Sequence, residues 1–190
     1  NATFPRGAPA NTNYGMQYQT AGSLYLNFPD QGTVTNYNRS LDIGKAVSTV
    51  GYTSNGINYK REYLASLSDK VIIIRLSADK AGSISLDLGM DSPFKNSTVA
   101  VKNNLLTLSG VSGSSDNKKG SVRYQVQVLP KIEGGKIIAT HDQIQIAKAN
   151  TVTLYISIGT NFVNYKDISG NEVQKASSFL GTAFKKTYSA

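Results

Sequence analysis

Short runs of alternating apolar and polar residues, separated by turn residues, recur along most of this 190-residue chain. Residues 24–28 read Leu-Tyr-Leu-Asn-Phe, and this period of two is typical of a strand with one buried face. Strands are also expected at 46–52, 57–64, 71–76, 83–88, 98–102, 105–109, 121–129, 136–139, 143–147 and 151–158. Helical segments do not alternate with these runs, so a parallel sheet is not expected. The pattern predicts an all-β fold, a large antiparallel β-sandwich of two sheets.

Two of these runs carry more detailed signals. Asn55-Gly56 separates two alternating runs, and this dipeptide favours a tight hairpin because both residues tolerate a positive φ. Residues 71–76 read Val-Ile-Ile-Ile-Arg-Leu. Such a nearly continuous apolar and β-branched run predicts a central strand that is covered on both faces.

Only the end of the chain changes to a helical period. Apolar residues recur at helical spacing from 171 to 188, which predicts an amphipathic helix. Asn171 or Ser169 could cap its start, and no stop signal precedes Ala190. Its apolar face needs a partner, either the sandwich or a segment beyond this sequence, and we favour a boundary cut within a longer protein. The expected organisation is an irregular segment at 1–20, the sandwich at 21–168 and a linker helix at 169–190.

Composition excludes several classes of function. Without cysteine, the chain cannot form disulfides, thiolate metal sites or a cysteine nucleophile. The net charge of +8 is dispersed and not clustered, which indicates solvated surfaces more than a nucleic-acid partner. No apolar stretch reaches 18 residues, so no membrane span is expected. We expect no cofactor and no metal.

Residues able to carry a reaction are sparse. Most of the twelve acidic residues lie beside turn signals, where Asp bonds its own backbone, so no pair of carboxyl groups stands out for glycoside hydrolysis. His141 is the single histidine and falls in an expected hairpin turn. No Gly-x-Ser-x-Gly elbow or phosphate-binding glycine loop is present. We predict no catalytic residue in this chain.

The chain contains eleven tyrosines and no tryptophan. Exposed aromatic rings can stack on the apolar face of a sugar, but tyrosine is also a favourable residue on a half-buried strand. The strand interpretation is preferred, and sugar binding stays open as an alternative. The tyrosines that could stack on a sugar are Tyr14, Tyr18, Tyr37, Tyr52, Tyr59 and Tyr165.

Several short segments, in a fixed order and spacing, carry a resemblance to a known family. They are residues 15–19, 22–26, 37–43, 59–62, 71–78, 90–93 and 160–167, followed by the Ala- and Lys-containing helix. Together they resemble the N-terminal β-sandwich domain of glycoside hydrolase family 95, the α-L-fucosidases. The resemblance covers about residues 14–190 and implies a supersandwich-like fold.

In that family the sandwich precedes a linker helix and an (α/α)₆ barrel. The barrel carries the catalytic Glu and the Asp/Asn group of an inverting mechanism, and none of these residues matches a position here. The resemblance therefore implies a non-catalytic domain that supports, and could rim, the active site of a barrel hydrolysing terminal α-L-fucosides. By this interpretation the chain alone is not an enzyme, whereas its parent protein is one. Its partners would be that barrel and, through it, fucosylated glycans, in a periplasmic, cell-surface or secreted location.

The loops at 14–19 and 160–167 are the segments expected to face the barrel. Both are rich in amides and tyrosine, which suits a domain interface or hydroxyl recognition, and an interface is the preferred interpretation. One alternative is a free-standing carbohydrate-binding or cell-surface β-sandwich. Another is the corresponding sandwich of a related glycosidase or disaccharide phosphorylase family. The candidate interface or substrate-rim residues are Met16, Gln17, Tyr18, Gln19, Asn161, Asn164 and Tyr165.

Overall fold

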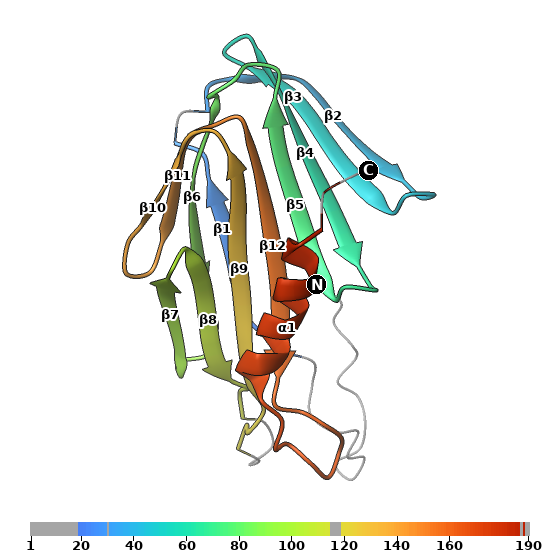
Figure 1. Ribbon diagram of the computed structural model, residues 1–190, viewed down its shortest axis with the longest axis vertical. Helices are drawn as coiled ribbons and strands as arrows, with labels where there is room; N and C mark the ends of the chain where they lie inside the picture. The colour runs from blue at the N-terminus through green and yellow to red at the C-terminus, as the bar shows by residue number, and fades with distance from the viewer. Residues whose placement is uncertain (1–18, 30, 115–118, 187, 189–190) are drawn as a thin grey trace, which may run out of the picture.

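The computed structural model describes residues 19–29, 31–114, 119–186 and 188. In this part of the chain, twelve strands form two antiparallel sheets, and one helix lies against the larger sheet (Figure 1). The elements are β1 (Ser23–Asn27), β2 (Val34–Asp42), β3 (Val47–Ser54), β4 (Ile57–Ser66), β5 (Val71–Ala78), β6 (Ile84–Asp91), β7 (Ser97–Lys102), β8 (Leu105–Val111), β9 (Arg123–Glu133), β10 (Lys136–Ala139), β11 (Ile144–Ala149), β12 (Thr151–Thr160) and α1 (Glu172–Phe184).

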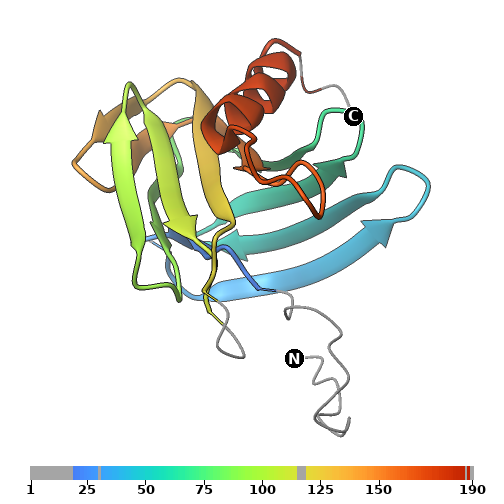
Figure 2. The same ribbon diagram turned by 90° about the horizontal axis from the view of Figure 1, so that it is seen from below.

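The smaller sheet has the order β1-β6-β11-β10, and the larger one β2-β3-β4-β5-β12-β9-β8-β7. Each strand pairs antiparallel with its neighbours, so the predicted two-sheet sandwich is confirmed. Seen from below, the large sheet curves, α1 covers its outer face, and β2 and β3 project away from the rest (Figure 2). Every residue of β2 is exposed, which agrees with this position.

β2 is the strand that the alternation pattern did not predict. Its pairing with β3 shifts register between Thr35 and Asn38, and Asn36 has a φ of 50°. This irregularity is a β-bulge, which adds an unpaired residue and interrupts the period of two. Because the strand is also exposed, no apolar periodicity marks it.

The main core lies between the two sheets. Alternate residues of β6 and β11 in the small sheet pack against alternate residues of β5, β8, β9 and β12 in the large sheet, and burial of this apolar surface is the main driving force for folding. The cluster consists of Ile74, Leu76, Ile84, Leu86, Leu88, Leu106, Val128, Ile144, Ile146, Ala149, Val152 and Leu154.

Both local predictions can be checked against the backbone. Asn55 and Gly56 connect β3 to β4 with φ angles of 50° and 74°, so the hairpin is confirmed. β5 is a central strand of the large sheet, as predicted. The expectation that both of its faces are fully covered is wrong at Ile72, which is 50% exposed. Ile72 shares a face with Ile74, but the core between the sheets includes Ile74 and not Ile72.

Helix α1 begins where the sequence predicted. The side chain of Asn171 accepts a hydrogen bond from the backbone N–H of Gln174 at 2.9 Å, so Asn171 is the N-cap. The helix ends at Phe184, several residues before the predicted end at 188. Lys186 N–H bonds to the carbonyl of Ala183, and this tighter i to i−3 bond closes the last turn.

The apolar face of α1 has its partner within the chain. Its buried residues Ala176, Leu180 and Ala183 face the outer side of the large sheet, where Leu180 and Ala183 join a second cluster with Val71 and Tyr155. The hydroxyl of Ser157 on β12 also donates to the carbonyl of Ala176 at 3.0 Å. Among the described residues, no helix is long and apolar enough to cross a membrane.

Ion pairs fix α1 near both of its ends. Arg123 Nε lies 2.9 Å from Glu172 Oε1, and the hydrogen bond from Arg123 holds the pKa of Glu172 below its ordinary value of 4.5. At the other end, Lys186 pairs with Asp69. Hydrogen bonds from Lys186 and then Ser66 hold the pKa of Asp69 below its ordinary value of 3.8.

These lowered pKa values predict how stability depends on pH. A carboxyl group with a lower pKa in the folded state stabilises the fold above its unfolded pKa, and this contribution disappears as pH falls through the folded value. We therefore expect the melting temperature to fall between about pH 5 and pH 2. Glu172→Gln should make that fall shallower and lower the melting temperature at pH 7. Asp142→Asn, at an exposed turn carboxyl, is the control, and an equal effect of both variants would contradict the assignment.

Candidate interaction site at the end of the sandwich

The structure brings Gln19, from the 14–19 segment that the sequence singled out, and part of the 160–167 segment to one hollow at an end of the sandwich. The hollow has a volume of about 690 Å³ and is lined in part by residues at the end of β12 and the start of the connection to α1. This part of the chain lies at the lower end of Figure 1. Gln19 belongs to the 14–19 segment, while Thr160 and Phe162 belong to the 160–167 segment. The lining residues are Gln19, Thr20, Ala21, Phe94, Ser112, Val122, Tyr124, Ile158, Thr160 and Phe162.

Gln19 is held by two hydrogen bonds to one glycine. The backbone N–H of Gly113 donates to Gln19 Oε1 at 2.7 Å, and Gln19 Nε2 donates to the carbonyl of Gly113 at 3.3 Å. Both ends of the amide are therefore used within the chain, and they tie residue 19 to the connection after β8. The other candidates of this segment, Met16, Gln17 and Tyr18, lie outside the described residues.

Asn161 lies inside the protein, with no exposed surface. Its Oδ1 accepts a hydrogen bond from the backbone N–H of Arg123 at 2.8 Å, and its Nδ2 donates to the carbonyl of Ile168 at 2.8 Å. The side chain thus fastens both ends of the 162–168 loop to β9. This geometry gives Asn161 the role of positioning the loop.

Replacement of Asn161 by alanine should destabilise the fold by about 1–3 kcal/mol, because two backbone groups would lose their partners in a buried place. Urea unfolding of Asn161→Ala measures this effect. Asn164→Ala is the matched control on the same loop, and its effect should be several-fold smaller since Asn164 is exposed. Equal destabilisation by the two variants would contradict the assigned role.

The outer part of the loop carries the other two candidates. Asn164 and Asp167 form an isolated β-bridge, and Asn164 Oδ1 accepts a hydrogen bond from the backbone N–H of Lys166 at 2.9 Å. These contacts shape the loop into a tight turn. Tyr165 at its tip is 85% exposed, and the ammonium group of Lys166 approaches its ring, at 5.3 Å from the centroid.

Several exposed apolar side chains lie on and beside this loop, and the sequence analysis had singled out only Tyr165 among them. We define the end surface as the exposed side chains of Ile158, Phe162, Val163, Tyr165 and Ile168. Ile158 has the same orientation on β12 as the core residue Leu154, yet it is 48% exposed. The available signal was the apolar pair Phe162-Val163 within an otherwise polar loop, because loops normally carry polar residues.

The inner wall of the hollow is rigid. The rings of Phe94 and Tyr124 meet edge to face, with centroids 6.2 Å apart. The Tyr124 hydroxyl lies 2.8 Å from Ser92 Oγ, and this serine donates to the carbonyl of Ala21 at 2.7 Å. A preformed wall of this kind loses little conformational entropy when a partner binds.

Three of the described carboxyl groups do not suit the role of a general acid. The pKa values of Asp69, Asp167 and Glu172 are all lowered by hydrogen bonds, whereas a general acid for glycoside hydrolysis needs a raised pKa. The pKa of Asp167 is lowered by its hydrogen bonds with Ser169. Bonding to the local backbone of a turn is the role that the sequence predicted for Asp167. In the part of the chain that the structure describes, no group of three or more His, Cys, Asp or Glu residues could hold a metal ion.

Comparisons with known proteins agree with this architecture. Residues 4–165 match the family described as glycosyl hydrolase family 65, N-terminal domain. A stretch of 78 residues, 40% of this chain and 9% of the relative, is 38% identical to "Alpha-L-fucosidase 2" of Arabidopsis thaliana. A solved "Putative kojibiose phosphorylase from human microbiome" superposes with a TM-score of 0.56 at 15% identity, over 87% of this chain and 25% of that chain.

These matches confirm the recognition of a glycoside hydrolase N-terminal domain. The family model that matches is described as family 65. The sequence analysis had kept the sandwich of a related glycosidase or disaccharide phosphorylase family as an alternative. The fucosidase relative agrees with the resemblance to family 95. The chain spans only a small part of both matched proteins. The chain belongs to the family of glycosyl hydrolase family 65 N-terminal domains.

Proposed function

We propose that this chain is the non-catalytic N-terminal domain of a larger enzyme that hydrolyses α-L-fucosides. In this proposal the end surface packs against an (α/α)₆ barrel supplied by the same polypeptide. The observation that carries the proposal is the end surface itself, a set of five exposed apolar side chains on and beside one loop. Exposed apolar side chains that gather in one place mark interaction sites.

The chemistry of the hollow favours a protein interface over a sugar pocket. The amides of Gln19 and of the adjoining Asn161 bond to the chain's own backbone. Phe94, Ile158 and Phe162 supply large apolar groups to the lining. Sugar sites need convergent polar groups as well as an aromatic platform. Domain interfaces are instead formed by an apolar centre with a polar rim, and Lys166 and Asn164 would form such a rim.

The fucoside substrate is supported by similarity to a protein named alpha-L-fucosidase 2, over 78 residues at 38% identity. The domain is common to enzymes of different activity, since the matched solved structure is named a putative kojibiose phosphorylase. Fold alone does not choose between these activities. The location in the cell envelope or outside the cell belongs to the same proposal, because fucosylated glycans are found there, and fractionation of the native cells tests it.

Fucose release by four proteins tests the proposal. The complete parent polypeptide should release fucose from a fucosylated oligosaccharide, whereas this 190-residue chain alone should release none. The parent with Ile158→Asp and Phe162→Asp should lose most of its activity or its stability, since two buried charges at an apolar interface would be unpaired. Ile138→Asp, on the distant edge strand β10 and 40% exposed, is the matched control and should leave fucose release unchanged.

Other outcomes point to other functions. Turnover by this chain alone, abolished by changing one of its own carboxyl groups, would overturn the proposal. Calorimetric titration of the chain with fucosylated oligosaccharides tests the free-standing binding module, and heat that Tyr165→Ala abolishes would support that alternative. Phosphate-dependent cleavage of a disaccharide by the parent, without fucose release, would retain the interface and replace the substrate.

A further inference from the structure

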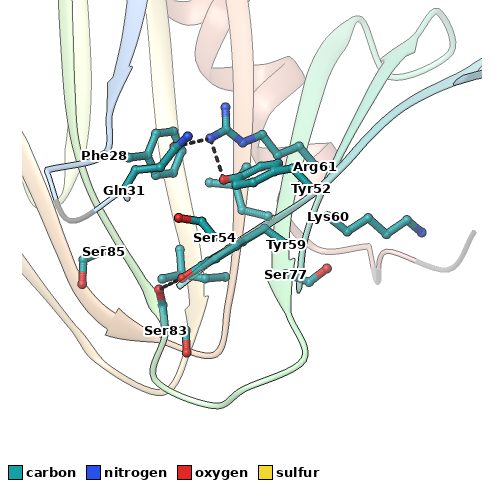
Figure 3. Close-up of a pocket in the computed structure, with 12 residues that line it drawn as sticks. Phe28, Gln31, Tyr52, Ser54, Tyr59, Lys60, Arg61, Ser77, Ser83 and Ser85 are labelled. Atoms are coloured by element: carbon teal, nitrogen blue, oxygen red, sulfur yellow. Dashed lines mark hydrogen bonds between the residues drawn. The ribbon is translucent and has the colours of Figure 1, made fainter. Parts of the chain in front are cut away.

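A second, much smaller cavity lies away from the end surface. It has a volume of about 40 Å³ and is lined by the β3–β4 hairpin, the end of β5, the segment after β1 and the start of β6 (Figure 3). Its lining combines aromatic rings, one guanidinium group and several hydroxyl groups. These groups come from Phe28, Gln31, Tyr52, Ser54, Tyr59 and Arg61, among other lining residues.

Arg61 is fixed in this cavity by its surroundings. Its Nη2 donates to Gln31 Oε1 at 3.1 Å and to the Tyr52 hydroxyl at 2.8 Å. The guanidinium carbon lies 4.1 Å from the centroid of the Phe28 ring and 5.0 Å from that of Tyr52, both within the range of cation–π attraction. Tyr52 is in turn stacked on Tyr59 with centroids 5.2 Å apart. The charged group therefore has one well-defined position.

Two polar groups in the cavity lack a partner among the described residues. Arg61 Nε and Ser54 Oγ are both buried without a hydrogen bond to that part of the chain, and Ser54 is only 3% exposed. Figure 3 shows Ser54 between the hydrogen bonds that Arg61 and Tyr59 make. Buried groups of this kind are costly unless something bonds to them, so the cavity has the chemistry of a polar site.

No carboxylate of the described residues forms an ion pair with Arg61. Among the described residues, the ion pairs within 4.0 Å join Lys60 to Glu62, Arg123 to Glu172 and Lys186 to Asp69. None of them includes Arg61, whose Nε atom is buried. The chain as a whole carries a net charge of +8, which favours anions near its surface.

The size of the cavity restricts its ligand. Pockets for sugars and similar molecules measure about 300–1,000 Å³, so a cavity of about 40 Å³ cannot enclose a sugar ring. It has room for a water molecule or an ion of similar size. We propose that the Arg61 cavity binds a monatomic anion of the halide class, held by Arg61 Nε–H and the Ser54 hydroxyl as donors. This site is independent of the end surface and of the proposed enzyme.

Thermal unfolding of the protein in sodium chloride, sodium bromide and sodium gluconate, at equal ionic strength, tests the proposal. Gluconate is too large for the cavity, so the wild type should melt at a higher temperature in chloride or bromide than in gluconate, by an amount that saturates with halide concentration. Arg61→Gln should abolish this difference. Lys136→Gln, which removes one charge from the distant strand β10, should retain it.

Ser54→Ala keeps the proposal testable if Arg61→Gln fails to fold. It removes one donor from the anion and leaves the aromatic residues in place, so the apparent halide affinity should fall about tenfold. Crystals grown with bromide should show anomalous scattering within hydrogen-bonding distance of Arg61 Nε and Ser54 Oγ. Equal melting temperatures of the wild type in all three salts, or a halide effect that persists in Ser54→Ala and Arg61→Gln, would overturn the proposal in favour of water alone.

Discussion

Replacement of Gly159 by alanine is expected to displace α1 from the large sheet and to lower the free energy of unfolding by about 3 kcal/mol. A Cβ atom at this position on β12 would lie 2.2 Å from the carbonyl oxygen of Glu172 and 2.8 Å from the backbone nitrogen of Ala176. Both atoms belong to the helix backbone and not to a flexible side chain. The helix would have to move, and its bond from Ser157 to Ala176 would be weakened.

The matched control is a second glycine on the helix itself. A Cβ at Gly181 would meet no atom within 4 Å, so Gly181→Ala should stabilise the protein by up to about 1 kcal/mol through higher helix propensity. Urea unfolding of both variants, followed by far-UV circular dichroism, gives the two free energies. If Gly159→Ala were as stable as the wild type, close packing of α1 on β12 would be wrong.

The parts of the fold that were predictable share a local cause. Short apolar runs between turn residues located eleven of the twelve strands, most of them by alternation and β5 by its continuous β-branched run. The Asn55-Gly56 hairpin and the Asn171 cap were predictable because each depends on the conformational or hydrogen-bonding preference of single residues. β2 was missed since a bulge breaks its period and it has no buried face.

Features that depend on the relative extent of the two sheets were not predictable. The eight-stranded sheet continues beyond the four-stranded one, so Ile72 and Ile158 are about half exposed although their sequence pattern is that of core residues. Sequence alone gives no measure of how far one sheet extends beyond the other. The helix end at Phe184 was likewise missed, because no glycine or proline in the sequence marks it.

Of the two segments that the sequence singled out as the candidate site, the structure describes only Gln19 of the first and all of the second. Sequence reasoning chose amides and tyrosines, and Gln19 does lie with Thr160 and Phe162 around one hollow. The structure directs the Gln19 and Asn161 amides into the chain's own backbone, while Phe162 and Ile158 carry the exposed apolar area. An amide in a loop looks the same in sequence whether it bonds to a ligand or to its own chain.

Leu154→Ala is expected to destabilise the protein by about 3–5 kcal/mol, because its side chain fills the middle of the main core. Leu154 is completely buried between the sheets, and it lies in the middle of the two β12 ladders, opposite Ile74 on β5 and Pro130 on β9. The surrounding residues come from both sheets, so the cavity left by the missing atoms cannot collapse without moving a strand. Equilibrium unfolding in urea measures this loss.

Ile158→Ala, four residues along the same face of β12, separates packing within the domain from packing against a partner. In this chain Ile158 is half exposed, so its truncation should cost less than about 1 kcal/mol. If the end surface is covered in the complete parent protein, the same change there should cost about 1–3 kcal/mol more, because the side chain is then fully buried. Leu154→Ala should cost the same in both proteins. An equally small effect of Ile158→Ala in the chain and in the parent would mean that the end surface stays open to solvent, and the proposed domain interface would have to lie elsewhere.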